Sequence, residues 1–340
     1  MANWGVSSFK VETTQPDSRV DSLFANGNMQ IPVVVSIKAT DNETSAPYNL
    51  SDDELDSIDL IDYDAPDSLL SEGWVYTAER DDTFYHTIGG PAGAATDAAV
   101  ANTASGDDAN QTKIYWVSAT KVENKRVAAR ITQPDGKIVT TCGPEYTSYV
   151  TLTGKVPIKY TTDNTKVVRE DTDNGTFKIV MELIEVEGHW DQDNYYVSSS
   201  VYDFIKAEIY GYDTTGCGQG HPADLRLTGC YAFWTPDNNM SLRLSFIWQF
   251  GPQSTQEAGL TQEDGWCAAL AHPNITINQK SNALCLTRLR FNADIPLPMW
   301  KDRWANSDCG FTIYDIYGNW GKFSAGFSDD HDLIKIKNAN

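Results

Sequence analysis

The sequence lacks the segments that export most proteins or anchor them in membranes. Residues 1–10 contain neither the basic start nor the apolar stretch of a secretory signal peptide. No run of about 18 consecutive apolar residues occurs, so we expect no transmembrane segment. We therefore expect a protein that is cytoplasmic or is released without a signal peptide, with the mature form of an exported protein as the alternative.

Positive charge is also scarce. Lysine and arginine total 26 residues against 47 aspartates and glutamates, which gives a formal net charge of −21 at pH 7. The phosphates of DNA and RNA and the headgroups of anionic lipids repel a chain this acidic. The composition therefore predicts a soluble protein with no nucleic-acid partner and no polybasic membrane anchor.

Cysteine is too rare for a disulfide scaffold, with six residues in a chain of 340. One cluster combines thiols with an imidazole: Cys217, His221, Asp224 and Cys230. It lacks the paired ligand spacing of structural zinc sites. A disulfide between its two cysteines in an oxidising setting is the alternative, and free core cysteines are the default expectation.

A second acidic segment resembles a calcium-binding loop. Residues 171–175 read Asp-Thr-Asp-Asn-Gly, and Glu182 follows at the twelfth position. The glycine stands at the fifth position instead of the sixth, and the residues leading to Glu182 have the pattern of a strand. We therefore expect no metal site and no cofactor, with loose Ca²⁺ binding at this acidic turn as the alternative.

Catalytic signatures are missing as well. The sequence has no Gly-x-Ser-x-Gly elbow, no His-Glu-x-x-His and no phosphate-binding loop. Its five histidines are scattered and have no evident nucleophile beside them. Paired carboxylates of the glycosidase type remain open, because sequence spacing cannot give their separation. We predict that the protein is not an enzyme.

In place of helical periodicity, the sequence shows alternation with period two. Leu242, Leu244 and Phe246 lie on one face of a predicted strand, and a similar apolar row begins at Ile31. A capping box at Ser51–Glu54 predicts about one helical turn. These patterns predict an all-β protein with at most one or two short helical turns.

The last thirty residues predict a strand meander. Three runs rich in β-branched and aromatic residues, 311–317, 320–327 and 333–337, are separated by turn signals at Gly318-Asn319 and at 329–332. The lysines of the final run suit an exposed sheet edge, where charge discourages pairing with another chain. This segment is the clearest piece of predicted architecture.

The length of the chain and the turn-forming residues between its short predicted strands favour two antiparallel domains, each like a β-sandwich and each with long loops. We place them at residues 1–153 and 154–340, with strands at 149–153 and 156–162 on either side of Gly154. Residues 89–111 are poor in bulky side chains, so we predict a mobile loop there.

Aromatic residues flanked by acids and amides are the candidate ligand-binding sites. Aromatic faces can cover the apolar side of a sugar while carboxylates and amides bond its hydroxyls. The residues 189–196 are predicted to form one such loop, and Asn319-Trp320 is a second place of this kind. The candidate residues are Trp190, Asp191, Asp193, Asn194, Tyr195, Asn319 and Trp320.

The leading functional hypothesis is a non-enzymatic binding protein, lectin-like or toxin-like, that recognises a glycan or another cell-surface ligand. The alternative is a self-assembling structural, inclusion or particle subunit, and hence a homo-oligomer, because many strand edges are expected. A further alternative is a pore-forming protein that uses the 89–111 loop.

Overall fold

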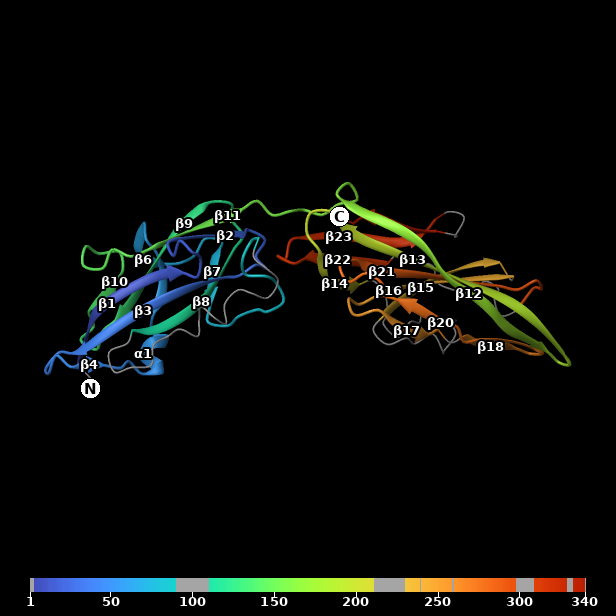
Figure 1. The fold of residues 1–340 in the computed structure, drawn as a ribbon, viewed down its shortest axis with the longest axis horizontal. Helices are drawn as coiled ribbons and strands as arrows, with labels where there is room; N and C mark the ends of the chain where they lie inside the picture. Colours follow the sequence, from blue (N-terminus) through green and yellow to red (C-terminus); the bar gives the residue numbers. More distant parts are fainter. Residues whose placement is uncertain are drawn as a thin grey trace. The chain divides into compact units, whose positions relative to one another are not determined.

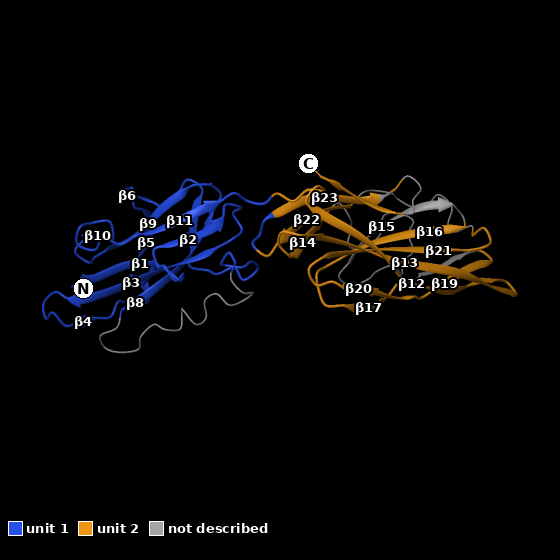
Figure 2. Ribbon diagram, turned by 45° about the horizontal axis from the view of Figure 1, so that its top comes forward, with its two compact units in different colours: residues 1–158, 317–319 blue, residues 159–316, 320–340 orange. Residues whose placement is uncertain are grey.

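The computed structural model is an all-β protein, as the sequence predicts (Figure 1). It describes residues 3–89, 110–210, 230–238, 240–258, 260–297, 309–328 and 333–339. Two compact units are coloured in Figure 2: unit 1 comprises residues 1–158 and 317–319, and unit 2 comprises residues 159–316 and 320–340. The sequence predicts the boundary between residues 153 and 154.

Some expectations fall outside the described residues. They concern the 89–111 loop apart from its ends, residues 217–224 of the cysteine–histidine cluster, and the turn at 329–332. No helix in the described ranges has the length and hydropathy that a bilayer crossing requires.

The first sheet of unit 1, sheet A, is antiparallel. Its strands are, in spatial order, β1 (Trp4–Thr13), β3 (Ile31–Asp41), β8 (Gln111–Ala119) and β7 (Trp74–Thr77), with β4 (Pro47–Tyr48) paired to β3. Alternation determines which side chains of β3 enter the core: Val33, Val35 and Ile37 are fully buried, whereas Val34 and Ser36 between them are partly exposed.

Sheet B is the second sheet of unit 1. Its strands are, in spatial order, β2 (Val20–Phe24), β11 (Val150–Lys155), β9 (Asn124–Thr132), β5 (Asp59–Asp62) and β6 (Ala65–Leu69), with β10 (Ile138–Thr140) paired to β9. β2 and β11 run parallel, which departs from the antiparallel arrangement that the sequence predicts. Their pairing joins segments far apart in the chain.

Sheets A and B form a sandwich, with β2, β9 and β11 on one side and β1, β3 and β8 on the other (Figure 2). Tyrosines bridge the layers: the Tyr115 hydroxyl donates to the Ile58 carbonyl, and the Tyr76 hydroxyl donates to Asp59 at 3.2 Å. The helix α1 (Asp52–Asp56) begins with the predicted capping box, in which Ser51 and Glu54 bond each other's backbone N–H groups.

Asp21 lies on β2 opposite Leu152, and its carboxyl group makes the stability of the fold depend on pH. Its carboxylate accepts hydrogen bonds from the Ser22 N–H at 2.7 Å and from Gln15 Nε2 at 3.2 Å. Burial outweighs these bonds and raises the pKa of Asp21 to about 6, from an ordinary value of 3.8. Because the folded state holds this proton more tightly than the unfolded chain, the carboxyl lowers stability increasingly as the pH rises from about 4 to about 6.

Asp21→Asn should therefore raise the free energy of unfolding at about pH 7 by about 1–2 kcal/mol, allowing for solvent screening of a partly exposed carboxyl. Near pH 3, where the carboxyl is protonated in both states, the two proteins should unfold alike. Urea titrations across this pH range measure the difference. Asp67→Asn, the same change on the exposed strand β6, is the control. Equal gains at both pH values would contradict the assignment to Asp21.

Sheet C is the largest sheet of unit 2. Its strands are, in spatial order, β15 (Cys230–Asn238), β16 (Ser241–Trp248), β21 (Leu284–Asn292), β13 (Ile184–Ser199), β12 (Thr165–Met181), β19 (Cys267–Ala271) and β18 (Leu260–Asp264). All eight residues of β16 are buried, so both faces of this strand are covered.

Two smaller sheets complete unit 2. Sheet D contains β14 (Phe204–Tyr210), β22 (Cys309–Asp315), β23 (Trp320–Phe327) and β24 (Ile334–Asn338), and sheet E contains β17 (Ser254–Glu257) and β20 (Asn274–Ile277). Three strands of sheet D are the predicted C-terminal meander, which is confirmed. Sheet E contributes Ile275 and Ile277 to a core shared with Phe246.

The strand predicted at residues 156–162 is wrong, because these residues do not form a strand. Gly154, predicted to separate two strands, lies inside β11, where its N–H donates to the Glu123 carbonyl at 2.8 Å. The glycine marks a close approach of two backbones and does not mark a turn.

Candidate ligand-binding site

The predicted ligand-binding residues between 190 and 195 lie on strand β13, so the prediction of a loop there is wrong. β13 is flanked by β12 and β21, and its side chains alternate between the two faces of sheet C. Asp191, Asp193 and Tyr195 therefore share one face, whereas Trp190 and Asn194 share the other.

An ion-pair network occupies the first face. Asp193 and Arg288 are cross-strand neighbours, and each side chain is 1% exposed. Arg288 Nε donates to Asp193 Oδ2 at 2.7 Å, and Nη2 bonds both Asp193 and Asp191. Burial opposes the charge of Arg288, but these carboxylates outweigh it and raise the pKa of the guanidinium. Arg169 lies 2.9 Å from Asp193, so this carboxylate is committed to internal pairing.

The second face is occupied by packing and amide bonds. A Cβ at Gly175 would lie 2.7 Å from Trp190 Nε1, so the Trp190 ring lies directly against that backbone. Asn194 is fully buried, and its Nδ2 donates to the Thr276 carbonyl at 2.7 Å. With Tyr195 buried on the opposite face, these residues present no common surface to a ligand.

Asn319 and Trp320 differ in their surroundings. Asn319 is buried in unit 1, where its Oδ1 accepts from Asn26 Nδ2 at 3.0 Å and from the Ile158 N–H at 3.2 Å. Trp320 begins β23, and the Lys322 ammonium lies 5.7 Å from its ring centroid. At 37% exposure, Trp320 is the most accessible of the three predicted aromatic residues.

The acidic segment 171–175 is not a turn. It lies within β12, with a bulge between Asp171 and Asp173. Glu182 lies in the turn after β12, about 36 Å from Asp171 along an extended strand, so the two cannot share an ion. Among the described residues, no group of three or more His, Cys, Asp or Glu side chains could hold a metal.

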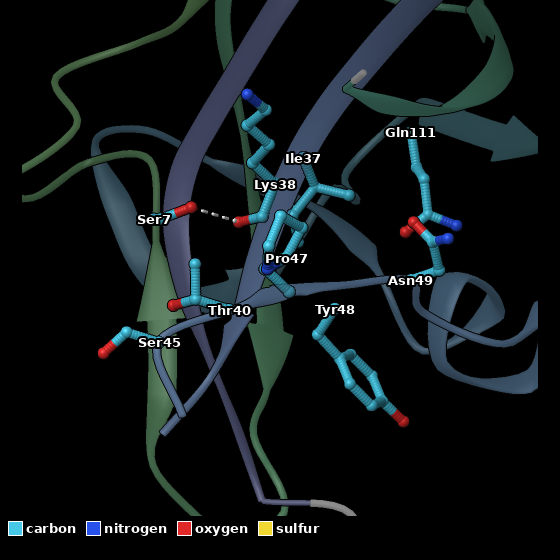
Figure 3. Close-up of a pocket in the computed structure, with 10 residues that line it drawn as sticks. Ser7, Ile37, Lys38, Thr40, Ser45, Pro47, Tyr48, Asn49 and Gln111 are labelled. Carbon is cyan, nitrogen blue, oxygen red and sulfur yellow. Dashed lines mark hydrogen bonds between the residues drawn. The ribbon is translucent and has the colours of Figure 1, made fainter. Parts of the chain in front are cut away.

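A hollow of about 200 Å³ opens in unit 1, and we call it the Tyr48 pocket (Figure 3). It lies where β3 changes its pairing partner: β8 pairs with β3 as far as Ile37, and β4 pairs with β3 at Ala39 and Thr40. The residues that line it are Ser7, Ile37, Lys38, Ala39, Thr40, Ser45, Pro47, Tyr48, Asn49 and Gln111.

The Tyr48 side chain is held in place on two sides. Its ring stacks on Trp4, with centroids 6.2 Å apart and planes 18° apart. Its hydroxyl donates to Glu54 at 3.4 Å, and Trp4 Nε1 donates to the same carboxylate at 2.6 Å. Burial opposes ionisation of Glu54, but hydrogen bonds from Ser51, Trp4 and Tyr48 outweigh it and lower the pKa of Glu54. The pocket therefore contains a pre-oriented aromatic ring.

Polar side chains line the rest of the pocket. Within the described residues, the Asn49 amide and the Thr40 and Ser45 hydroxyls form no side-chain hydrogen bonds, so they are available to a ligand. The Gln111 amide is instead committed to both backbone groups of Leu50, at 2.8 and 2.9 Å. Figure 3 shows the Asn49 and Gln111 amides pointing toward one another. The arrangement can bond hydroxyl groups and cover one apolar face.

Sequence reasoning missed the Tyr48 pocket. The available signal was Pro47-Tyr48-Asn49, an aromatic residue and an amide at the end of a polar turn. Like residues 189–196, this tripeptide combines an aromatic ring with an amide. Its significance depends on the contacts of Tyr48 with Trp4 and Glu54, which form only in the folded chain.

Comparisons with known proteins identify no family. No protein-family model matches the chain, and no curated protein does. Among solved structures, the C-terminal domain of the AgI/II polypeptide BspA from Streptococcus agalactiae is 9% identical, with a TM-score of 0.23 over 97% of this chain and 100% of that one. The C-terminal domain of the antigen I/II-family protein AspA from Streptococcus pyogenes is 11% identical (TM-score 0.20; 98% and 99%). SusF from Bacteroides thetaiotaomicron is 8% identical (TM-score 0.15; 99% and 94%). Likenesses this distant carry no argument about function.

Proposed function

We propose that this chain is a non-enzymatic binding protein that recognises a carbohydrate at a cell surface through the Tyr48 pocket. The observation that carries the proposal is the Tyr48 ring, fixed by Trp4 and Glu54, at the wall of a hollow with available amide and hydroxyl groups. A fixed ring loses little conformational entropy when a ligand stacks on it.

The chemistry of the lining favours a neutral sugar. Asn49 offers both a donor and an acceptor, and Thr40 and Ser45 offer hydroxyls that can do either. Such groups match the adjacent hydroxyls of a pyranose, while the ring covers its C–H face. A hollow of about 200 Å³ accommodates one sugar residue at the end of a chain.

Tyr48→Ala should weaken glycan binding by about tenfold or more, because it removes the stacking face. Asn49→Ala should weaken it by a smaller factor, through the loss of one or two hydrogen bonds. Binding is measured first on an array of neutral oligosaccharides and then by calorimetry with the best ligand found.

Asn174→Ala, an exposed asparagine on β12 of unit 2, is the matched control for Asn49→Ala and should leave the affinity unchanged. Thermal unfolding of each variant separates lost binding from lost folding. Absence of binding to any neutral glycan would refute the proposal. Release of reducing sugar from a bound oligosaccharide would contradict its non-enzymatic part.

A further inference from the structure

A second, larger hollow of about 420 Å³ lies in unit 1, and we call it the Arg19 pocket. It opens beside β1 and the parallel pair β2 and β11, where the chain leaves sheet A for sheet B. Its lining includes Lys10, Glu12, Asp17, Arg19, Tyr146 and Tyr149. The volume is within the usual range of small-molecule sites.

Hydrogen bonds that involve backbone groups hold the walls of the Arg19 pocket in place. The Val11 N–H donates to Ser148 Oγ at 2.9 Å, which joins strand β1 to the segment before β11. The Thr151 N–H donates to the Arg19 carbonyl at 2.7 Å, which fixes the backbone that carries the guanidinium. The Tyr146 hydroxyl donates to the Val6 carbonyl at 2.7 Å and so orients one of the two tyrosines in the lining.

Of the four charged side chains that line the Arg19 pocket, only Asp17 has a partner among the described residues, where its Oδ1 accepts from the Arg19 N–H at 3.1 Å. Within the described part of the chain, Lys10, Glu12 and Arg19 form no side-chain hydrogen bond or ion pair. Several other cations of unit 1 are paired with acids, as in Lys113–Asp56, Lys125–Asp62, Arg126–Asp64 and Arg130–Asp59. In a chain with a net charge of −21, two cations left without such partners beside one hollow are available to an external anion.

We propose that the Arg19 pocket binds a sugar residue that bears a carboxylate. The Arg19 guanidinium and the Lys10 ammonium match the carboxylate, since arginine can bond it through two parallel N–H groups. Glu12 and Asp17 accept hydrogen bonds from the sugar hydroxyls, which a simple inorganic anion does not offer. Two tyrosines and the neighbouring hydroxyl groups complete a lining suited to a polyhydroxylated ring.

This site is independent of the proposed function, because the Arg19 pocket and the Tyr48 pocket share no lining residue. Variants of one pocket therefore leave the other intact, and failure of either proposal can be recognised separately.

Calorimetry with methyl glucuronide, methyl glucoside and acetate tests the Arg19 pocket. We expect the glucuronide to bind at least about tenfold more tightly than either comparison ligand, with an affinity that falls as salt increases. Arg19→Ala should remove the preference for glucuronide over glucoside, and Glu12→Gln should weaken both sugars. Lys137→Ala, the loss of one exposed cation in a turn of unit 1, is the control and should change nothing.

Equal affinities for glucuronide and glucoside would overturn the proposal, as would a preference that survives Arg19→Ala. If acetate bound as tightly as the glucuronide, the pocket would be a simple anion site, and the proposal that it recognises a sugar would be refuted. Because Arg19 is exposed, its truncation should leave the thermal unfolding midpoint unchanged. If the midpoint nevertheless falls, Lys10→Ala provides the same comparison, and a retained preference there would also refute the proposal.

Discussion

Asp193→Ala should destabilise the protein by about 3–5 kcal/mol, because it leaves the Arg288 guanidinium buried without its main counter-charge. Both side chains are 1% exposed, and Asp191, the other carboxylate that Arg288 bonds, is 40% exposed and so compensates the buried charge less well. Arg288→Met should cost less, since Asp193 keeps its ion pair with Arg169. Urea unfolding followed by far-ultraviolet circular dichroism measures both variants.

A double replacement tests whether the loss comes from the stranded charge. Asp193→Leu combined with Arg288→Met removes both charges and should recover most of the stability lost in Asp193→Ala. Asp64→Ala breaks the solvent-exposed pair with Arg126 and should cost less than about 1 kcal/mol. A loss in Asp193→Ala no larger than that in Asp64→Ala would show that the network contributes little.

Gly154→Ala should cost about 2–4 kcal/mol, even though alanine suits a strand better than glycine does. A Cβ at this position would lie 2.2 Å from the carbonyl oxygen of Lys121. That oxygen belongs to the turn between β8 and β9. Glu123 lies in the same turn; its carbonyl oxygen accepts the Gly154 N–H, and its carboxylate accepts the Trp74 indole N–H. The turn cannot retreat without breaking these bonds.

Gly143→Ala is the matched control for this position. An added Cβ there meets no atom within 4 Å, so the substitution should be neutral or slightly stabilising. Thermal and urea unfolding of the two variants give the comparison. Similar stabilities for Gly154→Ala and Gly143→Ala would mean that the Lys121 turn moves freely.

Much of the strand content could be predicted from the sequence, because alternation reports burial on one face directly. The apolar row of β3 and the meander from Cys309 to Asn338 were predicted with nearly their observed limits. Gly154 was misread because a glycine between apolar runs indicates a turn as readily as a close contact, and the contacting Lys121 carbonyl is distant in sequence.

The site was harder to predict. Polar side chains on both faces of residues 190–195 indicated a loop, yet each has a partner that lies far along the chain. Arg288 neutralises Asp193, and the Thr276 carbonyl satisfies Asn194. Sequence patterns reveal which groups need partners but do not reveal where the partners are. The Tyr48 pocket was missed for the same reason.

The parallel pairing of β2 with β11 has a consequence for biosynthesis. Val20 meets Thr151, so about 130 residues must leave the ribosome before the first strand of sheet B finds its neighbour, and such distant closure slows folding. Until β11 has been synthesised, Val20–Phe24 lacks this pairing partner, and unpaired strands of this kind are prone to aggregate. We therefore expect the formation of sheet B to benefit from chaperones that bind the nascent chain.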